Sequence, residues 1–316
     1  MKTRLVTGLA LAAMLSACGG GEDEGAAAEA AARAEQAARQ AYEREIRDWR
    51  ASRQERLLRP DGWLSLVGLH WITPGTTFVG SAKENGTRLG LGPAQLGMLT
   101  LDKSGSARLT IAEGADVLVD GEPAEGEVEL RSDAKGAPTV VAFNRGDASF
   151  VLIERSGRHA LRVRNAMART RTSFPGIEYF DINPDFRFVA RFEPHPPGKT
   201  LEIVNMLGMV EPTPNPGRVV FEKDGATYSL EALDEGDGQL FFVFADRTSG
   251  HETYAASRFL YAEPAGPDGT TVVDFNRAYN PPCAFTPYST CPMPPKENRL
   301  DLRVEAGEKK PLPFPE

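Results

Sequence analysis

The polar side chains that could carry chemistry gather in residues 246–298, which we call the motif region. They alternate there with aromatic residues and prolines, as in the run Asp274-Phe-Asn-Arg-Ala-Tyr-Asn-Pro-Pro-Cys. The candidates able to bind a ligand or transfer a proton are Asp246, Thr248, Ser249, Tyr254, Arg258, Asp274, Asn276, Asn280 and Asn298. Carboxylates, amides and a guanidinium group in one stretch predict a polar site, provided that the fold brings them together.

Five of these candidates support two chemical interpretations: Asp246, Arg258, Asp274, Asn276 and Asn280. In the first, they line one pocket, where the two carboxylates act as acid and base or bind a divalent cation with the amide oxygens. The arginine would then bind an anionic group. In the second, the same side chains cap turns and cross-link the backbone, so that the region is a structural hub. The first predicts an enzyme or small-ligand binder, and the second a non-enzymatic module.

The sequence contains no nucleophile elbow, no phosphate-binding glycine loop and no clustered zinc ligands. We therefore favour the non-enzymatic binding or structural module, expect no cofactor and no metal, and leave enzymatic activity open. His70 and His251 are not among these candidates.

A stretch of arginines precedes the motif region: Arg145, Arg155, Arg158, Arg162, Arg164, Arg169 and Arg171. Because Leu161-Arg162-Val163-Arg164 alternates, both of its arginines should face the same side of a strand. That side could meet anionic glycans, lipid head groups or an acidic partner. We favour a solvated strand face whose arginines pair with nearby carboxylates.

Cys18 ends a sequence typical of exported bacterial lipoproteins. Lys2 and Arg4 precede an apolar stretch over residues 5–15, and Leu15-Ser-Ala-Cys18 matches a lipobox. We predict that residues 1–18 are a signal peptide and that Cys18 carries a lipid that anchors the chain to a membrane. Because Gly19 rather than an aspartate follows, we expect the outer membrane of the cell envelope, facing the periplasm.

The remaining cysteines, Cys283 and Cys291, are predicted to form a disulfide in that oxidising compartment. A pair of metal thiolates is the alternative, but no Cys-x-x-Cys is present and only His251 is nearby. The net charge of −8 over 316 residues argues against nucleic-acid binding. The expected partners are therefore the membrane, through the lipid, and an envelope protein or glycan.

The periodicity predicts a mainly β fold. Residues 19–58 should form a flexible spacer over 19–25 and then an Ala-rich helical stalk, ended by the turn Arg59-Pro-Asp-Gly62. Beyond it, apolar residues alternate and turns recur about every ten residues, as in antiparallel sandwiches or barrels. Residues 106–111 and 116–120, which flank Glu113-Gly114, predict a hairpin. We expect two packed β units, over residues 59–170 and 171–316.

The chain resembles the domain of unknown function 1684 family over roughly residues 45–310. The resemblance rests on the motif region, on Asp61-Gly-Trp-Leu-Ser-Leu-Val-Gly-Leu69 upstream and on Ala306-Gly-Glu308 downstream. The residues that match, besides the candidates above, are Gly250, Thr253, Tyr279, Cys283 and Cys291. Members are often bacterial lipoproteins, so the resemblance is consistent with the anchor, but it implies no particular reaction.

Overall fold

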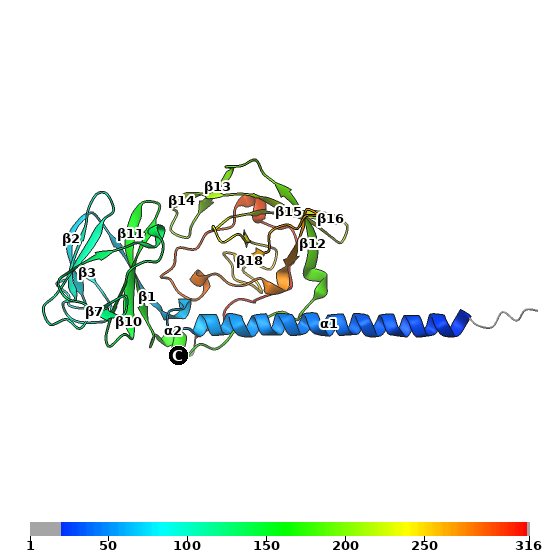
Figure 1. Cartoon of the computed structure of the whole chain (residues 1–316), viewed down its shortest axis with the longest axis horizontal. Coiled ribbons are helices and arrows are strands. Elements are labelled where there is room, and N and C mark those ends of the chain that lie inside the picture. Colours follow the sequence, from blue (N-terminus) through cyan, green and yellow to red (C-terminus); the bar gives the residue numbers. More distant parts are fainter. Residues whose placement is uncertain (1–19, 315–316) are drawn as a thin grey trace, which may run out of the picture. The chain divides into compact units, whose positions relative to one another are not determined.

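The computed structural model describes residues 20–314, which form one long helix followed by a mainly β body (Figure 1). The predicted signal peptide and Cys18 lie outside the described residues. The chain divides after Arg47 into two compact units, and the second begins at Asp48. Of the helices that the structure describes, none has the length and apolarity needed to cross a membrane.

Helix α1 spans Gly20–Leu58. The predicted stalk is thus correct at its end, but residues 20–25 are helical rather than a flexible spacer. Adding residues to an existing helix costs little, and the neighbouring Ala, Glu, Gln and Arg are strong helix formers. Pro60 disfavours helical backbone before it, and Gly62 closes the turn with a bond from its N–H to the carbonyl of Arg59 at 2.9 Å. A Cβ at Gly62 would lie 2.7 Å from the carbonyl oxygen of Arg56, so only glycine fits.

The first β group is a sandwich of two sheets. One sheet has the order β1-β11-β10-β9-β6-β7, and the other β3-β2-β4-β5-β8. Its strands are β1 Leu66–Ile72, β2 Gly75–Gly80, β3 Thr87–Arg88, β4 Gly97–Leu101, β5 Ala107–Ile111, β6 Leu118–Val119, β7 Glu122–Pro123, β8 Glu127–Leu130, β9 Val140–Phe143, β10 Ala148–Arg155 and β11 Arg158–Asn165. Both sheets contribute to one buried core, for example through Leu99 and Leu161.

The predicted hairpin at Glu113-Gly114 is wrong. Strand β5 pairs with β4 and β8, whereas β6 pairs with β7 and β9 in the opposite sheet. The chain crosses between the layers here, and Val117 is buried in the core on the way. Burial of this side chain favours a crossover that the turn residues alone do not specify.

The second β group contains a four-stranded sheet, β16-β15-β12-β19, and the pairs β13-β14 and β17-β18. Its strands are β12 Arg187–Pro194, β13 Thr200–Val204, β14 Val210–Pro214, β15 Gly217–Lys223, β16 Ala226–Ala232, β17 Leu240–Phe244, β18 Arg258–Ala262 and β19 Thr270–Asp274. All five residues of β17 are buried. Phe275 meets Phe221 and Phe244 edge to face, with ring centres 5.6 and 5.3 Å apart. Such contacts add about 0.5–1.5 kcal/mol each beyond burial.

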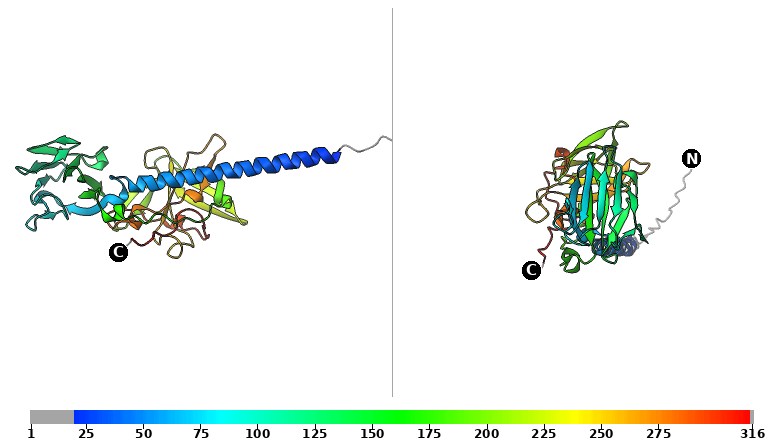
Figure 2. Two further views of the ribbon diagram at one scale, coloured as in Figure 1. Left: turned by 90° about the horizontal axis from the view of Figure 1, so that it is seen from below. Right: turned by 90° about the vertical axis from the view of Figure 1, so that its left-hand side faces the viewer.

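Short helices connect these strands: η1 Trp63–Ser65, η2 Asp133–Lys135, α2 Arg169–Thr172, η3 Pro184–Phe186, η4 Phe275–Arg277, η5 Pro282–Ala284 and η6 Lys296–Asn298. The mainly β fold with antiparallel sheets and an N-terminal helix is therefore confirmed, and no described sheet closes into a barrel. Figure 2 shows the strands of the first group from two further sides. The two main cores lie on either side of the predicted division near residue 170, and the domain boundary itself stays a prediction.

Candidate functional site

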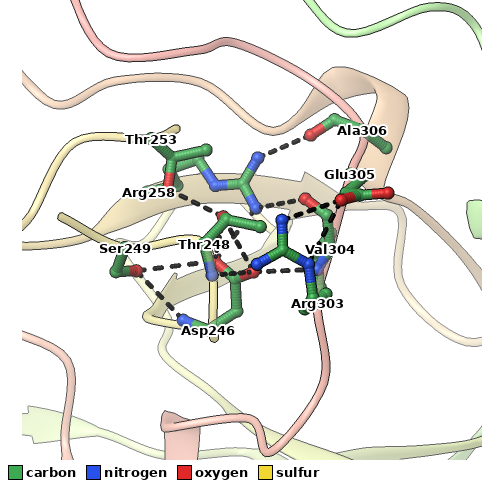
Figure 3. Close-up of polar contacts among 9 residues, drawn as sticks. All are labelled: Asp246, Thr248, Ser249, Thr253, Arg258, Arg303, Val304, Glu305 and Ala306. Carbon is green, nitrogen blue, oxygen red and sulfur yellow. Dashed lines mark hydrogen bonds and ion pairs between the residues drawn. The ribbon is translucent and has the colours of Figure 1, made fainter. Parts of the chain in front are cut away.

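The side chains of Asp246 and Arg258 form a buried ion pair beside β17 and β18. Nη2 of Arg258 lies 3.1 Å from Oδ1 of Asp246, and the two side chains are 1% and 0% exposed. The guanidinium group also donates to two backbone carbonyls, those of Val304 at 2.9 Å and Ala306 at 2.5 Å (Figure 3). Burial lowers the pKa of Arg258, and the Asp246 carboxylate opposes that shift. The arginine is thus committed to its own chain.

The Asp246 carboxylate is also fully engaged. It accepts the N–H groups of Val304 at 2.8 Å and Thr248 at 3.1 Å. The Thr248 hydroxyl donates to it as well, and lies 2.9 Å from the Thr253 hydroxyl. The hydroxyl of Ser249 accepts the N–H of Asp246 itself at 3.1 Å. This network joins residues 304–306 to the turn after β17, so its role is structural (Figure 3).

Asp274 and Asn276 belong to a second network, at the end of β19. Oδ1 of Asp274 accepts the backbone N–H and the side-chain amide of Asn276, each at 3.0 Å, and so caps η4. The Asn276 side chain bonds both backbone groups of Asn183, at 2.8 and 2.9 Å. Oδ2 of Asp274 lies 3.9 Å from Nε of the half-exposed Arg187. These contacts join η4 to the segment before β12.

Asn280 lies in a third network, which is centred on a buried ion pair that the sequence analysis missed. Nε of Arg53 lies 2.9 Å from Oε1 of Glu308, and these side chains are 5% and 0% exposed. Oε2 of Glu308 accepts the N–H of Asn280 at 2.7 Å, and Arg53 donates to the carbonyl of Asn280 at 2.9 Å. The Asn280 amide donates to the carbonyl of Lys309 at 2.7 Å. The Arg53 guanidinium group stacks 4.6 Å from the ring centre of Tyr279.

Asn298 joins two neighbouring strands of the second group. Its amide nitrogen donates to the carbonyls of Glu231 at 2.9 Å and Val243 at 3.0 Å, and its oxygen accepts the N–H of Glu231 at 2.7 Å. The Glu231 carboxylate in turn bonds His195 at 2.7 Å and Asn215 at 3.1 Å. Asn298 therefore supplies to β16 and β17 the hydrogen bonds that a neighbouring strand would supply.

Tyr254 and the two cysteines meet beside η5. The Tyr254 hydroxyl donates to the carbonyl of Cys283 at 3.1 Å, and burial raises the pKa of this phenol. The predicted disulfide is absent, because Cys283 and Cys291 are free thiols in this structure. Sγ of Cys291 instead accepts the N–H of Cys283 at 3.1 Å. The hydrogen bond from Cys283, helped by Ser289 and Arg162, lowers the pKa of Cys291 to about 7 against the effect of burial.

The structure does not assemble the predicted polar pocket. The five residues divide among separate networks, and each carboxylate accepts hydrogen bonds from the surrounding chain. Arg53, Glu231 and Glu308 were not among the predicted residues. Of these three, only Glu308 carried a signal in the sequence, through the Ala306-Gly-Glu match. In the described part of the chain, no three or more His, Cys, Asp or Glu side chains are placed to hold a metal.

A cleft of about 520 Å³ lies elsewhere, between β11 and the second β group. None of the five pocket candidates lines it, but Cys291 does. Its apolar wall includes Trp63, Ile203, Leu233, Phe241 and Phe259. Its cationic side chains are Arg155, Arg162 and Arg164, and its carboxylates are Glu154, Glu211, Asp234 and Glu235. This volume falls within the range of small-molecule sites.

Arg162 and Arg164 project from β11 into this cleft, while Leu161 and Val163 pack in the sandwich core. The prediction that Arg162 and Arg164 face the same side of a strand is confirmed. The prediction that this side is a solvated surface is wrong for these two residues. Each is half-buried, and Nε of each has no hydrogen-bond partner among the described residues. Burial lowers the pKa of Arg162 to about 10 and also lowers the pKa of Arg164, with Asp61 opposing the latter shift.

The carboxylates of the cleft have other partners. Glu211 accepts the backbone N–H and hydroxyl of Ser156, at 2.5 and 2.9 Å. Glu154 lies 3.3 Å from Nε2 of His159, and Arg155 pairs with Asp133 at 2.8 Å. Asp234 accepts the N–H of Gly236 at 2.7 Å, and Glu235 accepts the hydroxyl of Tyr261. The acids of the cleft therefore do not neutralise Arg162 and Arg164.

Comparison with known proteins identifies the second β group. The family model "Protein of unknown function (DUF1684)" matches residues 172–309. A solution NMR structure of an uncharacterized protein of Haloarcula marismortui is 31% identical, with 44% of this chain and 78% of that chain covered and a TM-score of 0.37. No curated protein matches the sequence. The chain therefore belongs to the DUF1684 family of proteins of unknown function.

Proposed function

We propose that this chain is a lipid-anchored binding protein of the bacterial cell envelope. In this proposal the motif region is the scaffold, and the cleft beside β11 is where a partner binds. The contrast between the two regions carries the proposal. The candidates of the motif region bond their own chain, and Nε of Arg258, which has no hydrogen-bond partner among the described residues, belongs to a side chain that is only 1% exposed. Nε of Arg162 and Nε of Arg164 also have no partner among those residues, but these two side chains line the cleft. Unsatisfied donors that line a cleft favour binding there over binding at the buried Asp246, Asp274 and Asn280.

The anchor part of the proposal rests on the lipobox that ends at Cys18. Acyl chains contribute about 0.8 kcal/mol per buried methylene, so a lipidated Cys18 would hold the chain firmly to a membrane. We expect the outer membrane, with the body in the periplasm and an envelope protein, glycan or other envelope molecule as the partner.

Fractionation of a Gram-negative host that expresses the full chain tests the anchor. The parent should sediment with outer membranes and incorporate labelled palmitate, and Cys18→Ala should lose both properties. Cys283→Ser is the matched control and should behave like the parent. If Cys18→Ala still sediments with membranes to the same extent as the parent, the anchor is excluded.

Thermal denaturation in the presence of envelope polysaccharide fragments, peptides and amphiphiles tests binding in the cleft. A ligand at a hundred times its dissociation constant should stabilise the fold by about 2.7 kcal/mol. Thr213→Trp, which fills the cleft, should abolish that shift, and Thr227→Trp on the exposed part of β16 should preserve it. If no class raises the melting temperature, or if the shift survives Thr213→Trp, the binding proposal fails.

A further inference from the structure

We propose that the cleft beside β11 binds an amphiphilic oxyanion, with its carboxylate or phosphate on Arg162 and Arg164 and its apolar chain along the aromatic wall. This inference rests on the proposed function and adds the chemical class of the ligand. It is argued from the donors that lack acceptors, from the carboxylates around them and from the apolar lining of the cleft.

The two guanidinium groups form the anionic subsite. Arg162 and Arg164 lie two residues apart on one face of β11, so their Cα atoms are about 7 Å apart. The hydrogen bond that Nη2 of Arg162 donates to the hydroxyl of Thr290 is long, at 3.4 Å. In the described part of the chain, the side chain of Arg164 makes no hydrogen bond and no ion pair. Half-buried guanidinium groups that have no carboxylate partner, and whose Nε lacks an acceptor, favour an oxyanion, which can accept two parallel N–H bonds from each.

The carboxylates of the cleft limit the charge of the ligand. Glu154, Glu211, Asp234 and Glu235 keep their own hydrogen-bond or ion-pair partners and carry negative charge into the same space. A polyanion would be repelled by them, because like charges in a partly desolvated cleft interact strongly. A single acidic head group on an uncharged body avoids that repulsion, so the cleft should select against polyanionic glycans.

The remaining lining suits an apolar chain. Phe241 and Phe259 are buried and meet edge to face, with ring centres 5.0 Å apart. Ile203 and Leu233 belong to the same buried cluster, and Trp63 also lines the cleft. An apolar chain that packs against such side chains is removed from water, which favours binding. The polar groups of the cleft then fix the orientation of the ligand, as in most small-molecule sites. An amphiphile uses both parts of the cleft.

Titration of the full chain carrying Cys18→Ala tests the inference without interference from the lipid. The probes are decanoate and decyl phosphate, each below its aggregation concentration. Decanol controls for the chain, and acetate and inorganic phosphate control for the head group. Either charged amphiphile should raise the melting temperature and change the tryptophan fluorescence. The three controls should bind at least tenfold more weakly. A preference for decanoate or for decyl phosphate assigns the oxyanion as carboxylate or phosphate.

Arg164→Gln should weaken binding of the preferred amphiphile at least tenfold. The free variant should melt at or above the temperature of the parent, because a half-buried charge without an acceptor has been removed. Arg299→Gln removes an exposed charge outside the cleft lining and should change neither property. Arg164→Met, which keeps the aliphatic stem, replaces the glutamine variant if that fails to fold.

Decanol binding as tightly as decanoate would overturn the inference, and so would unchanged affinity in Arg164→Gln. A lower melting temperature of the ligand-free Arg164→Gln variant would show that Arg164 has a structural role, and this result would also count against the inference. If glycans or peptides stabilise the chain through the cleft and amphiphiles do not, the binding function stands and the ligand class assigned here is wrong.

Discussion

At the scale of single residues, the polar side chains of the motif region act mainly on their own backbone. A buried charge needs a partner and further hydrogen bonds, and Asp246, Arg258 and Glu308 have both. Their burial explains why this part of the sequence holds many ionisable residues without forming an open site. Arg162 and Arg164, by contrast, line the cleft.

Glu308→Gln should destabilise the fold by about 3–5 kcal/mol, because it leaves the Arg53 guanidinium group buried without a countercharge. The glutamine also places an amide near the N–H of Asn280, which now donates to the carboxylate. Denaturant unfolding measures the loss. Glu305→Gln is the control, because Glu305 is half-exposed beside Arg303 and should matter by at most about 1 kcal/mol. Equal effects of the two substitutions would contradict the assignment.

His70 should make stability depend on pH below neutrality. Burial lowers its pKa from the usual value of 6.5, so the unfolded chain binds the proton more readily. Stability from this group is therefore full above pH 6.5 and is lost as the pH falls through the folded-state pKa. Between pH 7.5 and pH 5.5, the melting temperature of His70→Gln should fall by less than that of the parent. His251→Gln, at an exposed position, should match the parent. An unchanged pH profile in His70→Gln would refute this.

The sequence indicated where the polar residues lie but not what they bind. Asp246 and Asn298 were predicted as ligand-binding candidates, yet they bond backbone groups of residues 304, 231 and 243. Backbone groups are the same at every position, so no pattern of residue types reveals these pairings. Arg53 was missed for a related reason, since an arginine in a charged helix resembles its exposed neighbours until Glu308 is placed beside it.

At the scale of elements, side chains bond backbone N–H and carbonyl groups of strands that no neighbouring strand pairs. Asn298 bonds β16 and β17 at three backbone groups. Asn298→Asp keeps an acceptor and loses both donors, which leaves the carbonyls of Glu231 and Val243 facing a buried carboxylate. We expect a loss of about 2 kcal/mol or more in the free energy of unfolding.

The neighbouring Glu297→Gln is the matched control for Asn298→Asp. Glu297 is exposed, and its substitution should change stability by no more than about 0.5 kcal/mol. Hydrogen exchange across β16 and β17 should quicken in Asn298→Asp alone. Unaltered exchange there would show that Asn298 does not hold the two strands.

Gly307 lets the C-terminal segment pass close to η4. Its φ is +81°, and a Cβ would lie 2.4 Å from the carbonyl oxygen of Ala278 and 2.7 Å from that of Phe275. Gly114 also has a positive φ, +75°, but nothing within 4 Å of its Cβ position. Gly114→Ala should therefore cost about 1–2 kcal/mol from backbone conformation alone. Gly307→Ala should cost at least about 1 kcal/mol more, because the extra methyl has no space.

Chemical denaturation of Gly114→Ala and Gly307→Ala separates the two effects. If the two alanines cost the same, the close approach at Gly307 is not what the structure indicates.

Local sequence patterns predicted where elements end and which way their side chains face better than they predicted which strands or cysteines pair. The end of α1 followed from Pro60 and Gly62, and the facing of Arg162 and Arg164 followed from strand periodicity. The hairpin at Gly114 failed because a turn signal does not say which sheet receives the next strand. The expected disulfide failed because proximity along the sequence and compartment chemistry do not determine that two thiols are bonded.

At the scale of the whole molecule, the long C-terminal segment fastens the second β group together, and the cleft lies where that group faces β11. Residues 304–309 make hydrogen bonds in two of the networks described above, the one around Asp246 and Arg258 and the one around Arg53 and Glu308. Residues 304–309 thus cross-link the motif region, whereas Arg162 and Arg164 line the cleft, where Nε of each lacks a hydrogen-bond partner among the described residues.

Hydrogen–deuterium exchange with and without decanoate tests the division between scaffold and cleft most directly, because it observes both regions in one experiment. Binding should slow exchange at residues 205–213, 233–235 and 289–292, which border the cleft. Residues 246–258 and 274–280 should exchange slowly throughout and show no change. Arg164→Gln should remove the effect of decanoate. Slowed exchange at residues 246–258 or 274–280, with none at the cleft, would contradict the account and favour a ligand site in the motif region.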